Sequence, residues 1–370
     1  MKRIMILSAS IGAGHVKAAQ AIHESLNDLD DICIVEYDVL TFIPEICKNF
    51  LLGLYLYSLK SFPQVYDQAY AWGNDNKWAL YGKKLLNQVF SKKLLHYIRD
   101  YSPDCIIATH AIPAGFVSYL KEEKYIELMS ATVITDFAVH RLCFNQNTDL
   151  FFIAHEGLVS NKVFDNFSME KVYTTGIPVR QSFLEQVEKK KIYKDLNFVE
   201  DKPTILIMGG GAGLLPMEKI LREFEMIDIP LQVIAVAGNN NILYNKLQCV
   251  KSSRHDIKTF KFVQSIHQFM SISDLMITKA GGVTIAEALC KGLPMLIYRP
   301  FPGQENYNAK FIETAEVGYI IKDINKISRF IKFLLANNAA RLKELRENSQ
   351  AIAKPNAAKH IIECISQNFS

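Results

Sequence analysis

The chain has 370 residues, 49% of them hydrophobic and 22% charged, which suits two soluble domains of about 150 to 200 residues each. Its formal net charge of only +4 lacks the strongly basic balance of a dedicated nucleic-acid-binding protein. Seven scattered cysteines without a C-x-x-C pair argue against a zinc site and against a disulfide framework. The apolar stretches are too short for a signal peptide or a spanning helix, so a cytoplasmic protein is expected.

Short runs rich in β-branched residues alternate with longer helical patterns along almost the whole chain. In the first half, strands are expected at residues 3–7, 32–37, 104–109, 131–135, 150–154 and 171–174. In the second half, they are expected at 204–208, 231–236, 257–260, 274–278 and 295–298. This alternation predicts an α/β protein with two doubly wound, Rossmann-like domains. Two such domains facing each other would form a central cleft at the carboxyl ends of their strands.

The charge-rich segment 181–202 separates the two halves and is the predicted interdomain linker. An N-terminal domain is therefore expected at 1–180 and a C-terminal domain at 203–350. The last residues, 351–370, are expected to form a helix that packs back on the N-terminal domain.

Each half begins with a hydrophobic strand that runs into a glycine loop. In the first, Gly12-Ala13-Gly14-His15 allows a tight turn and places His15 at the start of a helix, although an ordinary turn with a surface histidine has the same pattern. In the second, the loop 209–213 lacks the Gly-Lys-Ser/Thr of a nucleotide-hydrolysing P-loop. Its amides at a helix start are nonetheless suited to a phosphate.

The segment 278–289 is the most informative, because a strand, a Gly281-Gly282 turn and a helix again build an anion site. Thr284 lies in the first turn of this helix and Glu287 lies one turn further on. A carboxylate there can accept hydrogen bonds from both hydroxyls of a ribose whose diphosphate sits on the turn. The other interpretation of Glu287 is that it complements the helix dipole.

Four motifs occur in one order, namely G-x-G-H at 12–15, T-D-x-x-x-H at 135–140, G-I-P-V-R at 176–180 and T-K-x-G-G-x-T-x-x-E-A-L to P-x-P-G-Q-E at 278–305. They resemble those of GT-B nucleotide-sugar glycosyltransferases, in the group of the peptidoglycan transferase MurG and monogalactosyldiacylglycerol synthase. The similarity is closest to bacterial processive diacylglycerol β-glucosyltransferases. It implies a GT-B fold and inverting transfer of a hexose, glucose in preference to galactose, from a UDP-sugar to diacylglycerol in glycolipid biosynthesis.

By this resemblance the C-terminal domain holds the UDP-sugar and the N-terminal domain takes the lipid. The implied donor-binding residues are Gly209, Gly210, Gly211, Gly213, Phe262, Val263, Lys279, Gly281, Gly282, Thr284, Glu287, Gln304 and Glu305. Gly12, Gly14 and His140 are the implied acceptor-binding residues. His15 is the expected general base. Asp136 is either a rival base, the partner that orients His15, or the cap of a turn.

No D-x-D motif stands between the donor and acceptor motifs, so neither a metal nor another cofactor is expected. Helix N-termini and Lys279 are expected to meet the charge of the leaving diphosphate instead.

Between residues 77 and 99 the chain is basic and lacks acidic residues. A helical arrangement places Lys84, Lys92 and Arg99 on one side and the apolar residues on the other, as in helices that lie on anionic lipid. A solvated basic face with an apolar face in the core has the same pattern. Residues 50–59 are a candidate acyl-chain groove. The expected location is therefore peripheral, on the inner face of the cell membrane.

Three other functions fit the same motifs. They are transfer to an undecaprenyl-linked acceptor, a UDP-sugar 2-epimerase-like reaction, and non-catalytic sensing of a UDP-sugar. The number of sugars added and the oligomeric state have no signature in the sequence.

Overall fold

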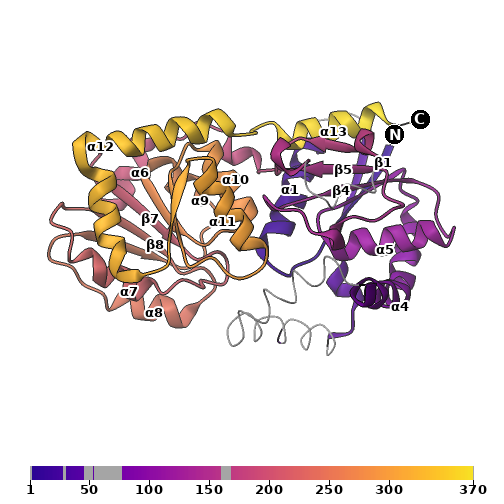
Figure 1. Ribbon diagram of the computed structural model, residues 1–370, viewed down its shortest axis with the longest axis horizontal. Coiled ribbons are helices and arrows are strands. Elements are labelled where there is room, and N and C mark those ends of the chain that lie inside the picture. Colours follow the sequence, from indigo (N-terminus) through magenta and orange to yellow (C-terminus); the bar gives the residue numbers. More distant parts are fainter. Residues whose placement is uncertain (1, 28–30, 46–52, 54–76, 160–167, 370) are drawn as a thin grey trace. The chain divides into compact units, whose positions relative to one another are not determined.

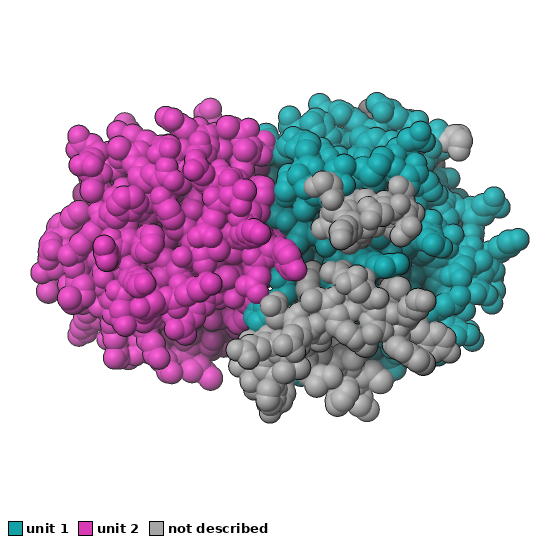
Figure 2. Space-filling model, viewed as in Figure 1, with its two compact units in different colours: residues 1–181, 302–304, 354–370 teal, residues 182–301, 305–353 magenta. Residues whose placement is uncertain are grey.

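The computed structural model describes residues 2–27, 31–45, 53, 77–159 and 168–369. The chain divides into two compact units, coloured teal and magenta in Figure 2. Unit 1 comprises residues 1–181, 302–304 and 354–370, and unit 2 comprises 182–301 and 305–353. Each unit contains a six-stranded parallel sheet with helices on both faces (Figure 1), which confirms the predicted α/β class.

The sheet of unit 1 has the strand order β2-β1-β3-β4-β5-β6. Its strands are β1 (Lys2–Ser8), β2 (Ile32–Asp38), β3 (Cys105–Ala108), β4 (Met129–Val133), β5 (Leu150–Ile153) and β6 (Val172–Thr174). The α-helices that the structure describes in this unit are α1 (Ala13–Asn27), α4 (Lys77–Tyr101), α5 (Ala111–Glu122) and α13 (Ala357–Gln367).

Strand β1 shows how this sheet is covered on both faces. Because successive side chains of a strand point to opposite faces, Ile4 and Ile6 pack in one core cluster with α1 and α13, where Ile361 is fully buried. Met5 and Leu7 pack in the other cluster, with α4 and α5. The C-terminal helix of the chain is therefore part of the core of unit 1.

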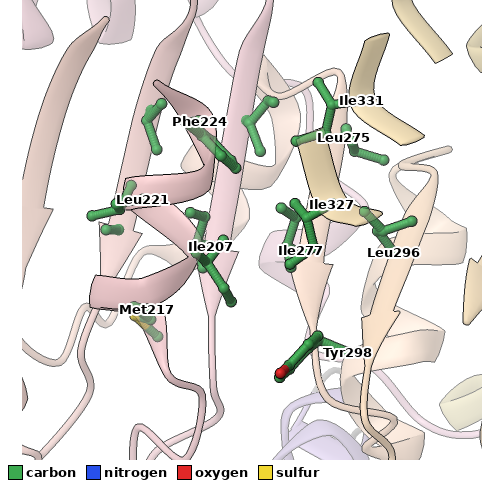
Figure 3. Close-up of a cluster of buried hydrophobic side chains, with 14 of the residues drawn as sticks. Ile207, Met217, Leu221, Phe224, Leu275, Ile277, Leu296, Tyr298, Ile327 and Ile331 are labelled. Carbon is green, nitrogen blue, oxygen red and sulfur yellow. The ribbon is translucent and has the colours of Figure 1, made fainter. Parts of the chain in front are cut away.

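The sheet of unit 2 has the order β12-β11-β10-β7-β8-β9. Its strands are β7 (Thr204–Met208), β8 (Gln232–Val236), β9 (Asp256–Phe260), β10 (Leu275–Thr278), β11 (Met295–Tyr298) and β12 (Gly318–Ile321). Its helices are α6 (Lys189–Leu196), α7 (Met217–Phe224), α8 (Asn241–Gln248), α9 (Ile266–Ile272), α10 (Gly282–Cys290), α11 (Gln304–Thr314) and α12 (Ile327–Ile352). In Figure 3, Ile207 and Ile277 of the sheet pack with Phe224 of α7 and Ile331 of α12.

The segment expected to be a linker folds as part of unit 2 from residue 182 onward. Helix α6 buries Ile192 and Leu196 on its one apolar face, and Tyr193 donates a hydrogen bond from its hydroxyl to the carbonyl oxygen of Ile272 at 3.0 Å. The charged residues of this short helix are all exposed.

Helix α4 differs from the helical arrangement expected for it. From residue 84 onward, its buried stripe consists of Asn87, Ser91, Leu94 and Ile98. At the Asn87 end, α5 approaches so closely that a methyl group on Gly115 would lie 2.8 Å from the Asn87 side-chain oxygen. Three of the apolar residues that the predicted arrangement places opposite the cations, namely Leu85, Leu86 and Val89, are exposed and lie outside this stripe.

The three cations predicted to face a membrane are all exposed. Lys84, however, forms an ion pair with Glu122 of α5, with 2.7 Å between Nζ and Oε1. Apart from Gly53, the candidate acyl groove at 50–59 lies outside the described residues. Within the described ranges, no helix is both long enough and apolar enough to cross a bilayer.

Candidate active site

The predicted catalytic residues of unit 1, His15 and Asp136, follow the carboxyl ends of β1 and β4, and the strand between them, β3, ends in two further polar residues. His15 lies in the first turn of α1, which follows β1. Thr109 and His110 follow β3, and Thr135 and Asp136 follow β4. Because parallel strands end at the same edge of a sheet, residues more than ninety positions apart meet here.

The His15 ring is held by two threonines. Its Nδ1 lies 3.0 Å from the backbone carbonyl oxygen of Thr109 and 2.7 Å from the side-chain oxygen of Thr135. The Thr109 hydroxyl donates to the backbone carbonyl oxygen of His15 at 3.0 Å. Asp136 acts on the imidazole through its charge. The chain therefore supplies a half-buried, fixed imidazole with a carboxylate nearby.

A second histidine lies against the first. The rings of His15 and His110 are perpendicular, with centroids 4.4 Å apart. The Nδ1 of His110 accepts a hydrogen bond from the backbone N–H of Ile112 at 3.1 Å, so His110 caps the N-terminus of α5. Nδ1 must be unprotonated to accept this bond, which leaves the ring proton of His110 on Nε2.

The environment of both histidines favours the neutral imidazole. Burial lowers the pKa of His15, and the charge of Asp136 and the hydrogen bond to Thr109 raise it by less. Burial also lowers the pKa of His110, well below its usual value, and a proton on the neighbouring His15 lowers it further. A neutral imidazole is the form that can accept a proton.

The residues predicted to bind the acceptor, Gly12, Gly14 and His140, have different local structures. Gly12 has φ +135°, a conformation that side chains rarely adopt, and a methyl group there would meet no atom within 4 Å. Gly14 lies in the first turn of α1. His140 is 6% exposed, and its Nδ1 accepts the N–H of Leu142 at 3.1 Å, which caps a short 3₁₀ helix.

In unit 2 the predicted donor-binding residues also follow the carboxyl ends of strands. Lys279 follows β10 and forms an ion pair through Nζ with Glu305 of α11. A methyl group on Gly281 would lie 3.6 Å from that Nζ and 3.8 Å from the Thr284 hydroxyl, and one on Gly210 would lie 3.0 Å from the Lys279 side chain. One cation, two glycine turns and a hydroxyl therefore gather at this edge.

Close packing against neighbouring backbone requires glycine at two positions of the loop 209–213. A methyl group on Gly213, whose φ is +58°, would lie 2.1 Å from the carbonyl oxygen of Ala237, and one on Gly209 would lie 2.7 Å from the backbone nitrogen of Leu214. The N–H groups of Gly213 and Leu214 donate within the loop. Helix α7 begins only at Met217, so the loop is not at a helix start as expected.

Helix α10 follows the Gly281-Gly282 turn directly, as predicted. Gly281 is its N-cap with φ −77°, and Gly282 is its first residue. Glu287 lies in the second turn with only 1% exposure. The fully buried Asn308 donates from its side-chain nitrogen to the carbonyl oxygen of Ala280 at 2.9 Å, which fixes the turn from α11.

The remaining predicted donor residues lie in the loops around this edge. Phe262, 51% exposed, and Val263 follow β9, and Gln304 is the first residue of α11. In the part of the chain that the structure describes, no group of three or more His, Cys, Asp or Glu side chains is placed to hold a metal ion.

Four contributing residues were not among the predicted site residues, namely Thr109, His110, Thr135 and Asn308. Thr109 ends a predicted strand and His110 directly follows it, just before a helix, and polar residues at that position are a usable signal. Asn308 lies within a helix and carries no such signal.

Comparison with known families gives two adjacent matches. Residues 15–179 match the model of monogalactosyldiacylglycerol (MGDG) synthase, and residues 204–364 match the C-terminal domain of glycosyltransferase family 28. The chain is 30% identical, over 98% of its length and 93% of theirs, to processive diacylglycerol beta-glucosyltransferases of Bacillus thuringiensis (strain Al Hakam) and Bacillus cereus (strain AH187).

Solved structures share the fold at lower identity. MurG of Acinetobacter baumannii superimposes with a TM-score of 0.65 at 15% identity, covering 99% of this chain and 100% of that one. The UDP-GlcNAc 2-epimerase of Neisseria meningitidis, bound to UDP-GlcNAc, gives 0.63 at 15% identity, with both chains fully covered. These likenesses confirm the GT-B fold. The chain is a glycosyltransferase and belongs to the family of the MGDG synthases and processive diacylglycerol glucosyltransferases.

Proposed function

We propose that this protein is an inverting hexosyltransferase that moves glucose, in preference to galactose, from a UDP-sugar to diacylglycerol. The observation that carries the proposal is the fixed, neutral His15 at the strand ends of unit 1, in a chain whose relatives are named for transfer to diacylglycerol. Unit 1 takes the lipid and unit 2 the nucleotide sugar.

His15 is the general base of this reaction. Its Nε2 takes the proton of the acceptor hydroxyl as the oxygen attacks the anomeric carbon in line with the departing UDP, so that an α-linked donor gives a β-glycoside. The imidazolium that forms is stabilised by the charge of Asp136, which raises the pKa of His15. Asp136 therefore serves as an electrostatic partner of His15. We assign Gly12 and Gly14 to the approach of the acceptor.

Unit 2 stabilises the leaving diphosphate. We assign this task to the amides at the N-terminus of α10, to Thr284 and to Lys279, with Glu287 on the ribose and Gln304 and Glu305 on the sugar. Phe262 and Val263 lie beside the uracil. Because fixed positive groups are in place, we propose that transfer needs no divalent metal, and activity should be the same with and without EDTA. A dependence on Mg²⁺ would contradict this.

The acceptor is a membrane lipid, so the protein must visit a bilayer. We propose that α4 makes this contact through the exposed Leu85, Leu86 and Val89, which occur with the exposed Lys92 and Lys93 on one helix. Apolar side chains next to cations match the chemistry of an anionic lipid surface. Lys84, which is paired with Glu122, contributes less.

The direct test supplies UDP-[¹⁴C]glucose or UDP-[¹⁴C]galactose with diacylglycerol in anionic vesicles. We expect release of UDP and a labelled glycolipid that partitions into organic solvent, with more product from glucose. Labelled product only with an undecaprenyl-linked acceptor, isomerisation of the donor without acceptor, or UDP-sugar binding with no turnover would each contradict the proposal.

A further inference from the structure

The tautomer of His15 follows from its hydrogen bonds. Nδ1 lies 3.0 Å from the backbone carbonyl oxygen of Thr109. A carbonyl oxygen can only accept, so the bond exists only if Nδ1 carries the proton. The opposite tautomer would place two lone pairs against each other. The carbonyl of Thr109 therefore selects the Nδ1–H form, and the free lone pair of the neutral ring is on Nε2.

Thr135 reinforces this choice from a different strand end. Its side-chain oxygen lies 2.7 Å from the same Nδ1. With the proton shared toward the Thr109 carbonyl, the hydroxyl oxygen of Thr135 acts as a second acceptor. The Thr135 hydroxyl can also donate, but donation to Nδ1 requires the tautomer that the carbonyl of Thr109 opposes. Thr135 is 5% exposed, so little water competes for the ring.

Thr109 holds His15 at two points. Its carbonyl accepts from the ring, and its hydroxyl donates to the backbone carbonyl oxygen of His15 at 3.0 Å. Because one residue fixes both the main chain and the side chain of His15, the ring has little freedom to turn. The charged or titratable groups that act on this ring are Asp136 and His110, and His110 is kept unprotonated at Nδ1 by its capping bond.

We propose that Thr109 and Thr135 are positioning residues that lock His15 in the Nδ1–H tautomer and so leave Nε2 as its basic atom. The catalytic meaning of this assignment rests on the proposed function, whereas the tautomer itself is a property of the resting protein. The two can therefore be tested separately.

The tautomer is read by NMR of protein labelled with [¹⁵N]histidine, near neutral pH and without substrate. The His15 signals are identified by their loss in His15→Gln. We expect a protonated Nδ1 and an unprotonated Nε2. A protonated Nε2 on His15 in the wild-type protein would overturn the inference.

The role of Thr135 is tested with Thr135→Val, which keeps the shape and removes the hydroxyl. We expect kcat to fall roughly fivefold to tenfold, as for one lost hydrogen bond, with an unchanged KM for the UDP-sugar and a new share of Nε2–H signal. Thr135→Ser should restore both. The matched control is Thr132→Val, a buried threonine in β4, which should leave kcat and the spectrum unchanged.

Identical spectra and kcat values for Thr135→Val and Thr132→Val would overturn the role of Thr135. If the spectra behave as expected but no variant, including wild type, transfers sugar to diacylglycerol, the tautomer assignment stands and the proposed function falls.

Discussion

Lys279 and Glu305 form an ion pair at the carboxyl edge of the sheet in unit 2, and it joins the loop after β10 to the first turn of α11. Both side chains are mostly buried, so the pair holds the ammonium group close to the Gly281 turn. A cation fixed in this position is available to a diphosphate without further ordering of its side chain.

Replacing Lys279 removes that cation. For Lys279→Met we expect kcat/KM for the UDP-sugar to fall by about tenfold to a hundredfold, because one charge-assisted contact is worth about 1.5–3 kcal/mol. Initial rates at varied donor concentration check this. The control is Lys310→Met, an exposed position on the same helix α11, which should behave as wild type. Equal kcat/KM for Lys279→Met and wild type would remove Lys279 from the donor site.

Alanine substitutions at Gly213 and Gly281 allow an effect on packing to be measured separately from an effect on ligand binding. Gly213→Ala should lower the stability of unit 2 by at least about 1–3 kcal/mol, because its φ of +58° is strained for alanine and its methyl would lie 2.1 Å from the Ala237 oxygen. Gly281→Ala should unfold at the wild-type temperature, since its nearest contact is 3.6 Å, yet bind UDP more weakly. Calorimetry and UDP titration measure the two effects. Wild-type UDP affinity in Gly281→Ala would contradict the assignment of that turn to the diphosphate.

The dependence of activity on pH measures the protonation of His15. A base must be unprotonated, and burial lowers the pKa of His15, so kcat/KM should stay high as pH falls to below 6.5, the ordinary histidine value. Asp136 raises this pKa. Asp136→Asn should therefore move the acidic limb to still lower pH and also reduce kcat, because the imidazolium loses its counter-charge. A limb that moves to higher pH in Asp136→Asn would contradict this electrostatic role.

The apolar face of α4 can be tested without touching the core. Leu85, Leu86 and Val89 are each more than half exposed, so changing all three to serine should leave the thermal unfolding temperature unchanged. Sedimentation with anionic vesicles should show weaker binding, because each side chain loses apolar contact with lipid. The control is Ile242→Ser in unit 2, which is 73% exposed. Equal vesicle binding by the triple variant and wild type would exclude α4 as the membrane contact.

Most of the fold was predictable because parallel strands that are buried on both faces appear as continuous apolar runs. All eleven expected strands are present, and one more, β12, completes the sheet of unit 2. β12 has only four residues and begins with Gly318, which is a weak strand signal. Helix α6 also has a weak sequence signal, because its two buried residues, Ile192 and Leu196, stand among charged residues.

The site was predictable only in part. Glycine turns, Lys279 and Glu287 could be proposed as site residues because they follow strands within short motifs. The bonds of His15 join residues 94 and 120 positions away, and no local pattern reports such contacts. The burial pattern of α4 was not predictable, because its periodicity does not show that Asn87 and Ser91 are buried while Leu85 is exposed.

Isothermal titration of UDP into the wild-type protein, Glu287→Ala and His15→Ala tests most directly whether unit 2 holds the donor. The account predicts that wild type and His15→Ala bind UDP equally and that Glu287→Ala binds at least about tenfold more weakly, through loss of charge-assisted bonds to the ribose. Absence of UDP binding by the wild-type protein, or weakened binding in His15→Ala alone, would contradict it.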